Sequence, residues 1–310
     1  MEDQLDQILK EKILSAVESP LPELTRRAVE LPASSNKALA VIGMRRAGKT
    51  SFLHQCRGDL MAQGRNPKNL VYFNFEDERL GGLQVADLHK VVDVHARLFP
   101  PSTQEKVGFF FDEIQLVPGW EQFCRRLLDS GTHEIFVSGS SAKLLSREIA
   151  TSMRGRAWEI LIQPFGFGEF LRHHGYAIPE DAGRLVARER AFLDHQFSVY
   201  LEVGGFPEAQ GMGIADRRKL LQGYVDVAVL RDIIEWHGIS NPVALRWLQR
   251  HLLGNPAAPF SIQKFHNALK SQGLPVSKDS LHLFLAYFED AFLIRTTSIF
   301  TASERQRMVN

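Results

Sequence analysis

The sequence predicts an α/β fold in which a parallel sheet carries helices on both faces. Between residue 37 and about residue 165, short apolar runs alternate with segments of helical periodicity, which is typical of a parallel sheet. A segment with two glycines, residues 43–50, joins the first apolar run to the first helical pattern. From about residue 185 the pattern is mostly helical. The expected parts are an N-terminal helix and connector (1–36), an α/β domain (37–184), a helical lid or linker (185–242) and a C-terminal domain that resembles a winged helix (243–310).

Local sequence supports each element in turn. Residues 2–18 space apolar side chains among charges and predict an amphipathic helix, after which Pro20, Pro22 and Pro32 favour an irregular connector. Apolar side chains at helical spacing from Phe52 to Leu60 predict the helix that follows residues 43–50, with Gly64 as its end. Strands are predicted at the apolar runs 37–42, 70–75, 107–111, 134–137 and 160–162.

Residues 43–50 read Gly-Met-Arg-Arg-Ala-Gly-Lys-Thr, the G-x-x-x-x-G-K-[ST] spacing of a phosphate-binding loop. Both required neighbours are present, because a strand precedes the loop and a helix follows it. Backbone N–H groups of such a loop converge on phosphate oxygens, and the dipole of the following helix favours their charge. The expected nucleotide-binding residues in the loop are Gly43, Arg45, Arg46, Ala47, Gly48, Lys49, Thr50 and Ser51.

The apolar run 107–111 ends in two acids, Asp112 and Glu113, the layout of a Walker B element. We expect Asp112 and Thr50 to hold Mg²⁺, and Glu113 to orient and polarise the attacking water. A strand at 70–75 precedes this element along the chain. An added strand and a glutamate directly after the aspartate characterise the ATPase branch of phosphate-loop proteins, and the chain lacks an Asn-Lys-x-Asp guanine motif. The expected ligands are therefore ATP and Mg²⁺.

Two further segments contain candidates for contact with the γ-phosphate. The run 134–137 is followed by Ser-Gly-Ser-Ser, where Ser140 or Ser141 could contact the γ-phosphate or the water, or could simply cap a helix at 142–148. Arg154 and Arg156 follow, and either guanidinium could stabilise transition-state charge, in cis or across the interface of a homo-oligomer. The alternative is a solvated arginine pair. Asp77 and Arg79 could line the nucleotide site or pair with each other.

Composition excludes several other classes. The charge is balanced, with 37 Lys and Arg against 36 Asp and Glu, so nothing indicates a nucleic-acid coat. No apolar run is long enough for a membrane span and no secretory leader is evident, so we expect a cytoplasmic protein. Cys56 and Cys124 lie on apolar helical stripes and are expected to be small buried side chains. The eleven histidines show no metal-ligand spacing; His133-Glu134 begins an H-E-x-x-H pattern, which fails at Val137.

The C-terminal segment predicts two helices and a turn. Ser261 is expected to cap the first helix, Gly273 to Pro275 make the turn, and a second helix runs from about Leu281 to Phe292. An apolar strand at 292–294 would complete a winged helix. Residues 243–310 hold eight Lys or Arg and four Asp or Glu, which permits nucleic-acid binding. The second helix offers no exposed arginine to guanine edges, so a packing or lid role is favoured.

Several ordered motifs resemble those of the predicted AAA-type ATPases of prokaryotes, the AAA_14 family with a DUF4143 C-terminal region. The resemblance runs from about residue 20 to the end, although Gly166 stands where that family usually has serine. It implies ATP binding and hydrolysis, and relatives usually continue into a nuclease-like domain, so the chain is expected to be truncated. The matching segments are residues 43–50, 74–80, 112–115, 138–141, 144–146, 153–156, 164–171, 204–208 and 230–234.

Three functional hypotheses follow. The favoured one is an ATPase with Lys49 and Thr50 on the phosphates and Mg²⁺, Asp112 on the metal and Glu113 on the water. The alternative is a DNA-binding regulator that nucleotide switches with little turnover. A phosphotransferase acting on a small molecule is the third, for which no second-substrate motif is found.

Overall fold

A computed structural model describes residues 2–32, 37–100, 105–139, 153, 155–179, 184–240, 242–298 and 300–301. The chain forms two compact units, Met1–Arg217 and Arg218–Asn310. In the described ranges, no helix has the length and apolarity needed to cross a membrane.

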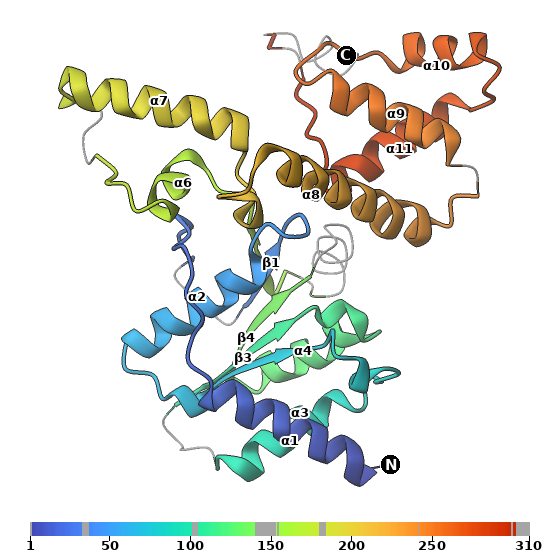
Figure 1. Ribbon diagram of the computed structural model, residues 1–310. Helices are drawn as coiled ribbons and strands as arrows, with labels where there is room; N and C mark the ends of the chain where they lie inside the picture. The colour runs from blue at the N-terminus through green and yellow to red at the C-terminus, as the bar shows by residue number, and fades with distance from the viewer. Residues whose placement is uncertain are drawn as a thin grey trace. The chain divides into compact units, whose positions relative to one another are not determined.

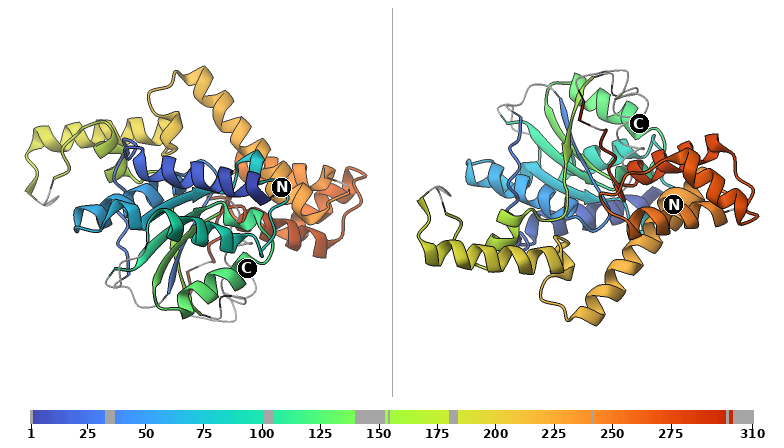
Figure 2. Two further views of the ribbon diagram at one scale, coloured as in Figure 1. Left: turned by 90° about the horizontal axis from the view of Figure 1, so that it is seen from below. Right: turned by 90° about the horizontal axis from the view of Figure 1, so that it is seen from above.

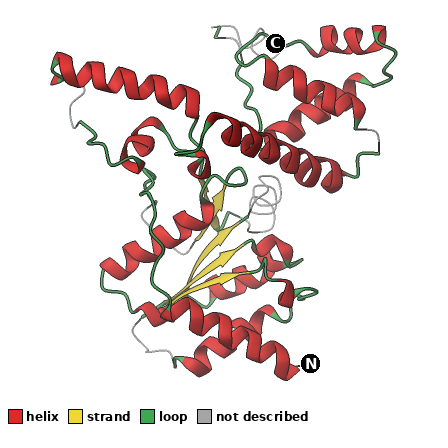
Figure 3. Cartoon of the chain, in the orientation of Figure 1, coloured by secondary structure: helices red, strands yellow, loops and turns green. Residues whose placement is uncertain are grey.

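The first unit is built on a five-stranded sheet in the order β2-β3-β4-β1-β5, in which all neighbours are parallel (Figures 1 and 3). The predicted parallel sheet is therefore confirmed. β2 precedes the Asp112 strand in sequence but occupies the edge of the sheet, and the strand between β1 and β3 is β4. The strands are β1 (Ala38–Ile42), β2 (Leu70–Asn74), β3 (Val107–Asp112), β4 (His133–Ser138) and β5 (Ala157–Leu161).

Helices cover both faces of this sheet, as predicted. Alternate side chains of β3 show this, because Phe111 contacts the Phe123 ring of α4 at 5.9 Å, whereas Asp112 on the other face accepts a hydrogen bond from Thr50 of α2. The helices of this unit are α1 (Glu2–Glu18), α2 (Lys49–Ala62), α3 (Leu88–Leu98), α4 (Trp120–Asp129), α6 (Phe167–His173) and α7 (Ala187–Val203), and α8 (Ile214–Val227) crosses the unit boundary. Short 3-10 turns are η1 (Pro67–Asn69), η2 (Glu78–Leu80), η3 (Ile114–Leu116) and η5 (Pro207–Ala209).

Helix α7 extends away from the sheet of the first unit, as the two views of Figure 2 show. Its one buried side chain among the described residues is Gln196. Phe197 and Tyr200 contact the Phe167 ring of α6 at 5.2 and 5.7 Å, and Phe192 nearer the start of the helix contacts the Tyr176 ring at 5.3 Å. The expected helical segment after residue 185 therefore begins with a largely exposed helix.

Strand β5 begins earlier than the apolar run 160–162 predicts. It spans Ala157–Leu161 and pairs with β1 alone at the sheet edge, where Trp158 and Leu161 are exposed. Because an edge strand is solvated along much of its length, it contains polar residues such as Glu159, and a search for continuous apolar sequence misses its start.

Both cysteines are free and buried, which confirms the expectation for them. Burial raises the pKa of the Cys56 thiol to about 12. Burial likewise raises the pKa of the Cys124 thiol, so both remain protonated and behave as apolar side chains.

Ion pairs between α1 and the segment after β2 resolve the question of Asp77 and Arg79. Asp77 pairs with Arg79 at 2.8 Å and with Lys12 of α1 at 2.8 Å, and Arg79 also approaches Glu11 at 3.5 Å. These residues therefore pair with each other and attach α1 to the sheet edge. Hydrogen bonds from Arg79 and Lys12 hold the pKa of Asp77 well below its usual value.

Substitution of Asp77 by asparagine is expected to destabilise the protein in a pH-dependent way. A carboxylate with a lowered pKa stabilises the fold above its unfolded pKa of about 4, and this contribution is lost as the pH falls through the folded value. Urea unfolding at neutral pH should show a loss on the order of 1–3 kcal/mol, and the gap from wild type should narrow below about pH 4. Asp93→Asn on the exposed face of α3 is the control, and equal effects of the two would contradict the assignment.

The second unit is helical. Helices α9 (Val243–Gly254), α10 (Ile262–Ser271) and α11 (Lys278–Asp290) pack around a common core with η6 (Ala228–Glu235), a π-helical segment that contains the motif 230–234. Ser261 caps α10 by accepting a bond from the Lys264 N–H, as predicted. The core residues are Val229, Ile233, Ala244, Leu245, Leu248, Phe265, Leu269, Leu281, Phe288 and Ala291.

The strand predicted at 292–294 is absent from the described part of this unit. Instead α11 ends in a left-handed turn at Phe292, with φ 55°, and the Leu293 N–H bonds to the Phe288 carbonyl at 3.0 Å. Leu293 and Ile294 then pack against the helical core. Their apolar character reflects burial against helices, which sequence alone does not distinguish from a strand.

Candidate nucleotide site

Two glycines give the loop between β1 and α2 its shape. Gly43 has φ 145°, and a Cβ there would lie 2.0 Å from the Ile162 carbonyl oxygen. Gly48 has φ 99° and directly precedes α2. Both positions disfavour any other residue, so the spacing of the motif has a structural cause here.

The start of α2 lies at this loop. The Phe52 N–H bonds to the Gly48 carbonyl at 3.0 Å, so the amides of the first turn, from Lys49 onward, precede the intrahelical ladder. Amides in this position, together with the helix dipole, bind anions. The Lys49 ammonium is buried against the loop and donates to the carbonyls of Gly43 at 3.1 Å and Met44 at 3.0 Å.

The carboxylate of Asp112 lies at the carboxyl end of β3, with hydroxyl groups on three sides. The Thr50 hydroxyl donates to one oxygen at 2.8 Å and the Tyr72 phenol donates to the same oxygen at 2.7 Å. The Ser138 hydroxyl donates to the other oxygen. Asp112 is 1% exposed. The register explains the cluster, because β2, β3 and β4 are parallel and end at the same sheet edge.

The phenol of Tyr72 is a permanent donor to this cluster. Burial, followed by the negative charge of Asp112, raises the pKa of Tyr72 far above its usual value. The paired oxygens of Thr50 and Asp112 are hard ligands of the kind that Mg²⁺ prefers, so the residues present fit the metal that the loop implies.

Glu113 has an unusual backbone and a close side-chain partner. Its φ of 56° is left-handed, which is uncommon outside glycine and is often found at functional sites. Its N–H approaches the Ser138 hydroxyl at 3.4 Å. The Gln115 amide donates to the Glu113 carboxylate at 2.5 Å, so this carboxylate is held by a neighbour two residues away.

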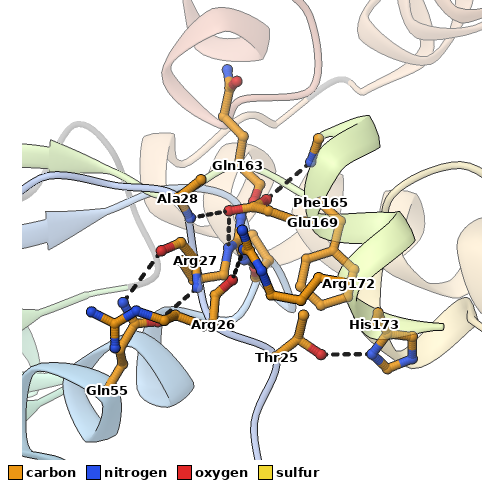
Figure 4. A network of polar contacts seen from close by, with 12 residues as sticks. Thr25, Arg26, Arg27, Ala28, Gln55, Gln163, Phe165, Glu169, Arg172 and His173 are labelled. Atoms are coloured by element: carbon orange, nitrogen blue, oxygen red, sulfur yellow. Dashed lines mark hydrogen bonds and ion pairs between the residues drawn. The ribbon is translucent and has the colours of Figure 1, made fainter. Parts of the chain in front are cut away.

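Arg27 connects the N-terminal connector to the phosphate loop, and Figure 4 shows its contact with Glu169. Its guanidinium donates to the Ala47 carbonyl of the loop at 2.8 Å, to Glu169 of α6 at 2.9 Å, and to the Gln163 carbonyl. It also lies over the ring of Phe165, 5.0 Å from the centroid. Since the side chain is 5% exposed, this is a buried cation whose donors meet partners on three segments.

The acid that pairs with Arg27 is itself held by the backbone. Glu169 accepts from the Ala28 N–H at 2.8 Å and, through its other oxygen, from the Gly166 N–H at 3.0 Å (Figure 4). Gln55 of α2 adds two bonds to the main chain of Arg27, at 2.7 and 3.3 Å. The connector, α2 and α6 are thereby fixed around the loop.

The segment 204–208 also reaches the loop. A Cβ on Gly205 would lie 2.2 Å from the Phe165 carbonyl oxygen, and the Phe165 N–H bonds to the Gly205 carbonyl at 2.6 Å. The next turn brings Pro207 within 3.9 Å of the Cβ position of Gly48. At the surface, Glu208 lies 3.8 Å from Arg46.

The structure brings most of the expected site residues together and separates others. The loop residues, Asp112 and Glu113 meet at the carboxyl ends of the strands, although Arg46, Thr50 and Ser51 are exposed there. Arg156 lies at the amino-terminal ends of the strands, opposite the site, because its carbonyl accepts the N–H of Ala38 at the start of β1. Its side chain pairs with Asp129 of α4, and the structure does not place it on the phosphates of its own chain. Ser140, Ser141 and Arg154 fall outside the described residues.

Sequence reasoning missed five residues at this site. Ser138 was within the Ser-Gly-Ser-Ser segment, but the neighbouring serines were favoured as contacts. Tyr72 could have been suspected from its place near the end of β2, and Gln115 from its spacing to Glu113. Arg27 gave no local signal, and Glu169 lay in the matching segment 164–171 without an assigned role, because 142 positions separate the two residues in sequence.

Two family models match parts of this chain. A family model described as an AAA domain matches residues 35–171. Over these residues the chain is similar to that family. Residues 194–310 match a domain of unknown function, DUF8612, in place of the expected DUF4143 region, which is not confirmed.

Two curated relatives are uncharacterized. The chain is 35% identical over 289 residues to a protein of Methanocaldococcus jannaschii, covering 93% of this chain and 62% of the relative. It is 33% identical over 254 residues to a protein of Haemophilus influenzae, covering 82% of this chain and 60% of the relative. The chain therefore spans about three fifths of the length of these relatives.

Similar solved structures include AMPPCP-bound DnaA from Aquifex aeolicus and the ADP form of the Aeropyrum pernix ORC2 protein. DnaA is 12% identical with a TM-score of 0.36, covering 93% of this chain and 88% of the other. ORC2 is 14% identical with a TM-score of 0.39, covering 93% and 84%.

Proposed function

We propose that residues 35–171 form an AAA-type domain that binds ATP with Mg²⁺ and hydrolyses it. The observation that carries this proposal is the 2.8 Å hydrogen bond between the Thr50 hydroxyl and the buried Asp112 carboxylate. It joins the residue after the loop lysine to the acid at the end of β3, which is the pairing that a magnesium nucleotide requires. The absence of a guanine-reading motif from the sequence favours ATP over GTP.

Each site residue has a role in this proposal. Lys49 would exchange its bonds with the carbonyls of Gly43 and Met44 for the β- and γ-phosphate oxygens, while the loop amides receive the remaining charge. Thr50 and Asp112 would hold Mg²⁺, which supplies charge neutralisation on the phosphates. Glu113 would leave Gln115 and accept a hydrogen bond from the attacking water.

An arginine from a neighbouring subunit would complete the site. Arginine fingers contribute roughly 10³–10⁵ in rate where they have been measured. Arg156 is exposed at the amino-terminal ends of the strands, away from the loop. Within this proposal it therefore acts only across a subunit interface. For Arg154, the proposal includes contact with the γ-phosphate of its own chain or of a neighbouring subunit.

Replacing Lys49 with alanine tests the phosphate-loop assignment. We expect affinity for a fluorescent ATP analogue to fall at least about 10-fold, because a desolvated ammonium is lost from the phosphates. Lys106→Ala, at an exposed side chain just before β3, is the control and should bind as wild type does. Unchanged affinity in Lys49→Ala would remove the basis of the proposal.

Steady-state ATPase activity against protein concentration tests turnover. A rise in specific activity with concentration is expected if an arginine enters from a second copy. Binding without turnover at any concentration would instead favour the alternative, a nucleotide-switched regulator.

A further inference from the structure

The second unit contains a long stretch without acidic side chains. Residues 236–278 hold five Lys or Arg and no Asp or Glu, whereas the average density of the chain would give about five acids. The stretch covers α9 and α10 entirely. The charge of the whole chain is nearly balanced, but residues 236–278 form a basic region.

Helix α9 presents two different faces. Ala244, Leu245 and Leu248 are buried in the core of the unit. At 100° per residue, the opposite side carries Arg246, Trp247 and Arg250 close together. All three are exposed, and Trp247 is 46% exposed. We call Arg246, Trp247 and Arg250 the outer stripe of α9.

The two arginines of the outer stripe have no acidic partner in the part of the chain that the structure describes. The acids of the adjacent helix α11 are Asp279, Glu289 and Asp290, and Glu289 is occupied with Thr296 at 3.0 Å. The Trp247 indole is exposed beside two guanidinium groups that no described acid neutralises, and it is not part of the core of this unit. This arrangement fits a ligand that is both anionic and aromatic.

We propose that the outer stripe of α9 binds single-stranded nucleic acid. Arg246 and Arg250 pair with backbone phosphates, and Trp247 stacks on an unpaired base. A duplex offers phosphates but no exposed base face, so single strands are preferred. Lys264 and Lys270 on the exposed side of α10 extend the positive field along the same acid-free stretch. The stripe is separate from helix α11, the second helix of the predicted winged helix.

Fluorescence anisotropy of a labelled oligothymidine of about 20 nucleotides, titrated with the full chain at low salt, tests this inference. We expect binding that weakens as salt rises. Trp247→Ala should lower affinity about 5- to 100-fold, the usual range for losing one base stack. The double variant Arg246→Gln/Arg250→Gln should reduce the slope of log K against log salt by about 1.4, since each phosphate contact on a single strand contributes about 0.7.

Matched controls come from the first unit. Trp158→Ala removes an indole that is 44% exposed on β5, and Arg188→Gln/Arg190→Gln removes two exposed guanidinium groups of α7. Both should bind the oligonucleotide as wild type does. The proposal fails if wild type does not bind at low salt, if Trp247→Ala binds normally, or if duplex of equal length competes equally. Dimerisation abolished by Trp247→Ala would assign the stripe to a second copy of the chain instead.

Discussion

Glu113→Gln is expected to lose ATP turnover by roughly 10²–10⁴-fold while nucleotide remains bound. The amide keeps the size and hydrogen-bonding reach of the carboxylate but cannot take a proton from water. The binding groups, Lys49, Thr50 and Asp112, are untouched by this substitution. Turnover is measured by phosphate release at saturating ATP, and binding by titration with the fluorescent analogue.

Glu76→Gln provides the control for removing one carboxylate from the same unit. Glu76 is exposed after β2, so its variant should hydrolyse ATP at the wild-type rate. Wild-type turnover by Glu113→Gln would exclude Glu113 as the group that activates water. Loss of nucleotide from this variant would show instead that Glu113 contributes to binding.

Gln115 holds the same carboxylate that Glu113→Gln removes. The Gln115 amide donates to the Glu113 carboxylate at 2.5 Å. In the proposed mechanism this bond must break before each turnover. Gln115 therefore belongs with Glu113 in any account of the rate.

The sheet and the phosphate loop were predictable from sequence because local rules determine them. The strand β3 is six residues long and buried throughout, so an apolar run ending in Asp112 marks it directly. Gly43 and Gly48 are required by backbone conformation at their own positions. Such features depend on a few adjacent residues, and periodicity and spacing therefore reveal them.

The polar contacts around Asp112 were not predictable in the same way. Whether Ser138 or a later serine meets Asp112 depends on the register between β3 and β4, in which Phe111 lies opposite Val137. A shift of one residue would direct a different side chain to the carboxylate. The same limit applies to Arg156. Its position at the amino-terminal ends of the strands is determined by the pairing of β5 with β1.

Long-range contacts around Arg27 were beyond sequence analysis for another reason. The connector between Pro20 and Pro32 has no periodic pattern, and its conformation follows from partners far along the chain. Arg27 meets Ala47 and Gln163, which lie 20 and 136 positions away. Only the assembled fold shows that this arginine supports the loop.

Arg27→Met is expected to lower the free energy of unfolding by about 3–5 kcal/mol, because it leaves Glu169 as a buried, unpaired charge. The adjacent Arg26→Met is the matched control. Arg26 pairs with an acid too, in a bidentate contact with Asp59 at 2.6 and 3.0 Å, but its side chain is 60% exposed, so its loss should cost less than about 1 kcal/mol. Urea unfolding of both variants measures the difference, and equal losses would contradict the burial argument.

Arg27→Met and Arg26→Met also show whether Arg27 supports the phosphate loop in addition to stabilising the fold. Arg27 donates to the Ala47 carbonyl, so its removal should free the loop and weaken ATP binding even where the variant is fully folded. Arg27→Lys keeps the charge but can reach fewer of the three acceptors, and it should recover part of the stability and less of the affinity. Normal ATP affinity in folded Arg27→Met would limit the role of this residue to holding the connector against α6. A loss of affinity that Arg26→Met does not share would show that the buried guanidinium maintains the phosphate loop in its binding geometry.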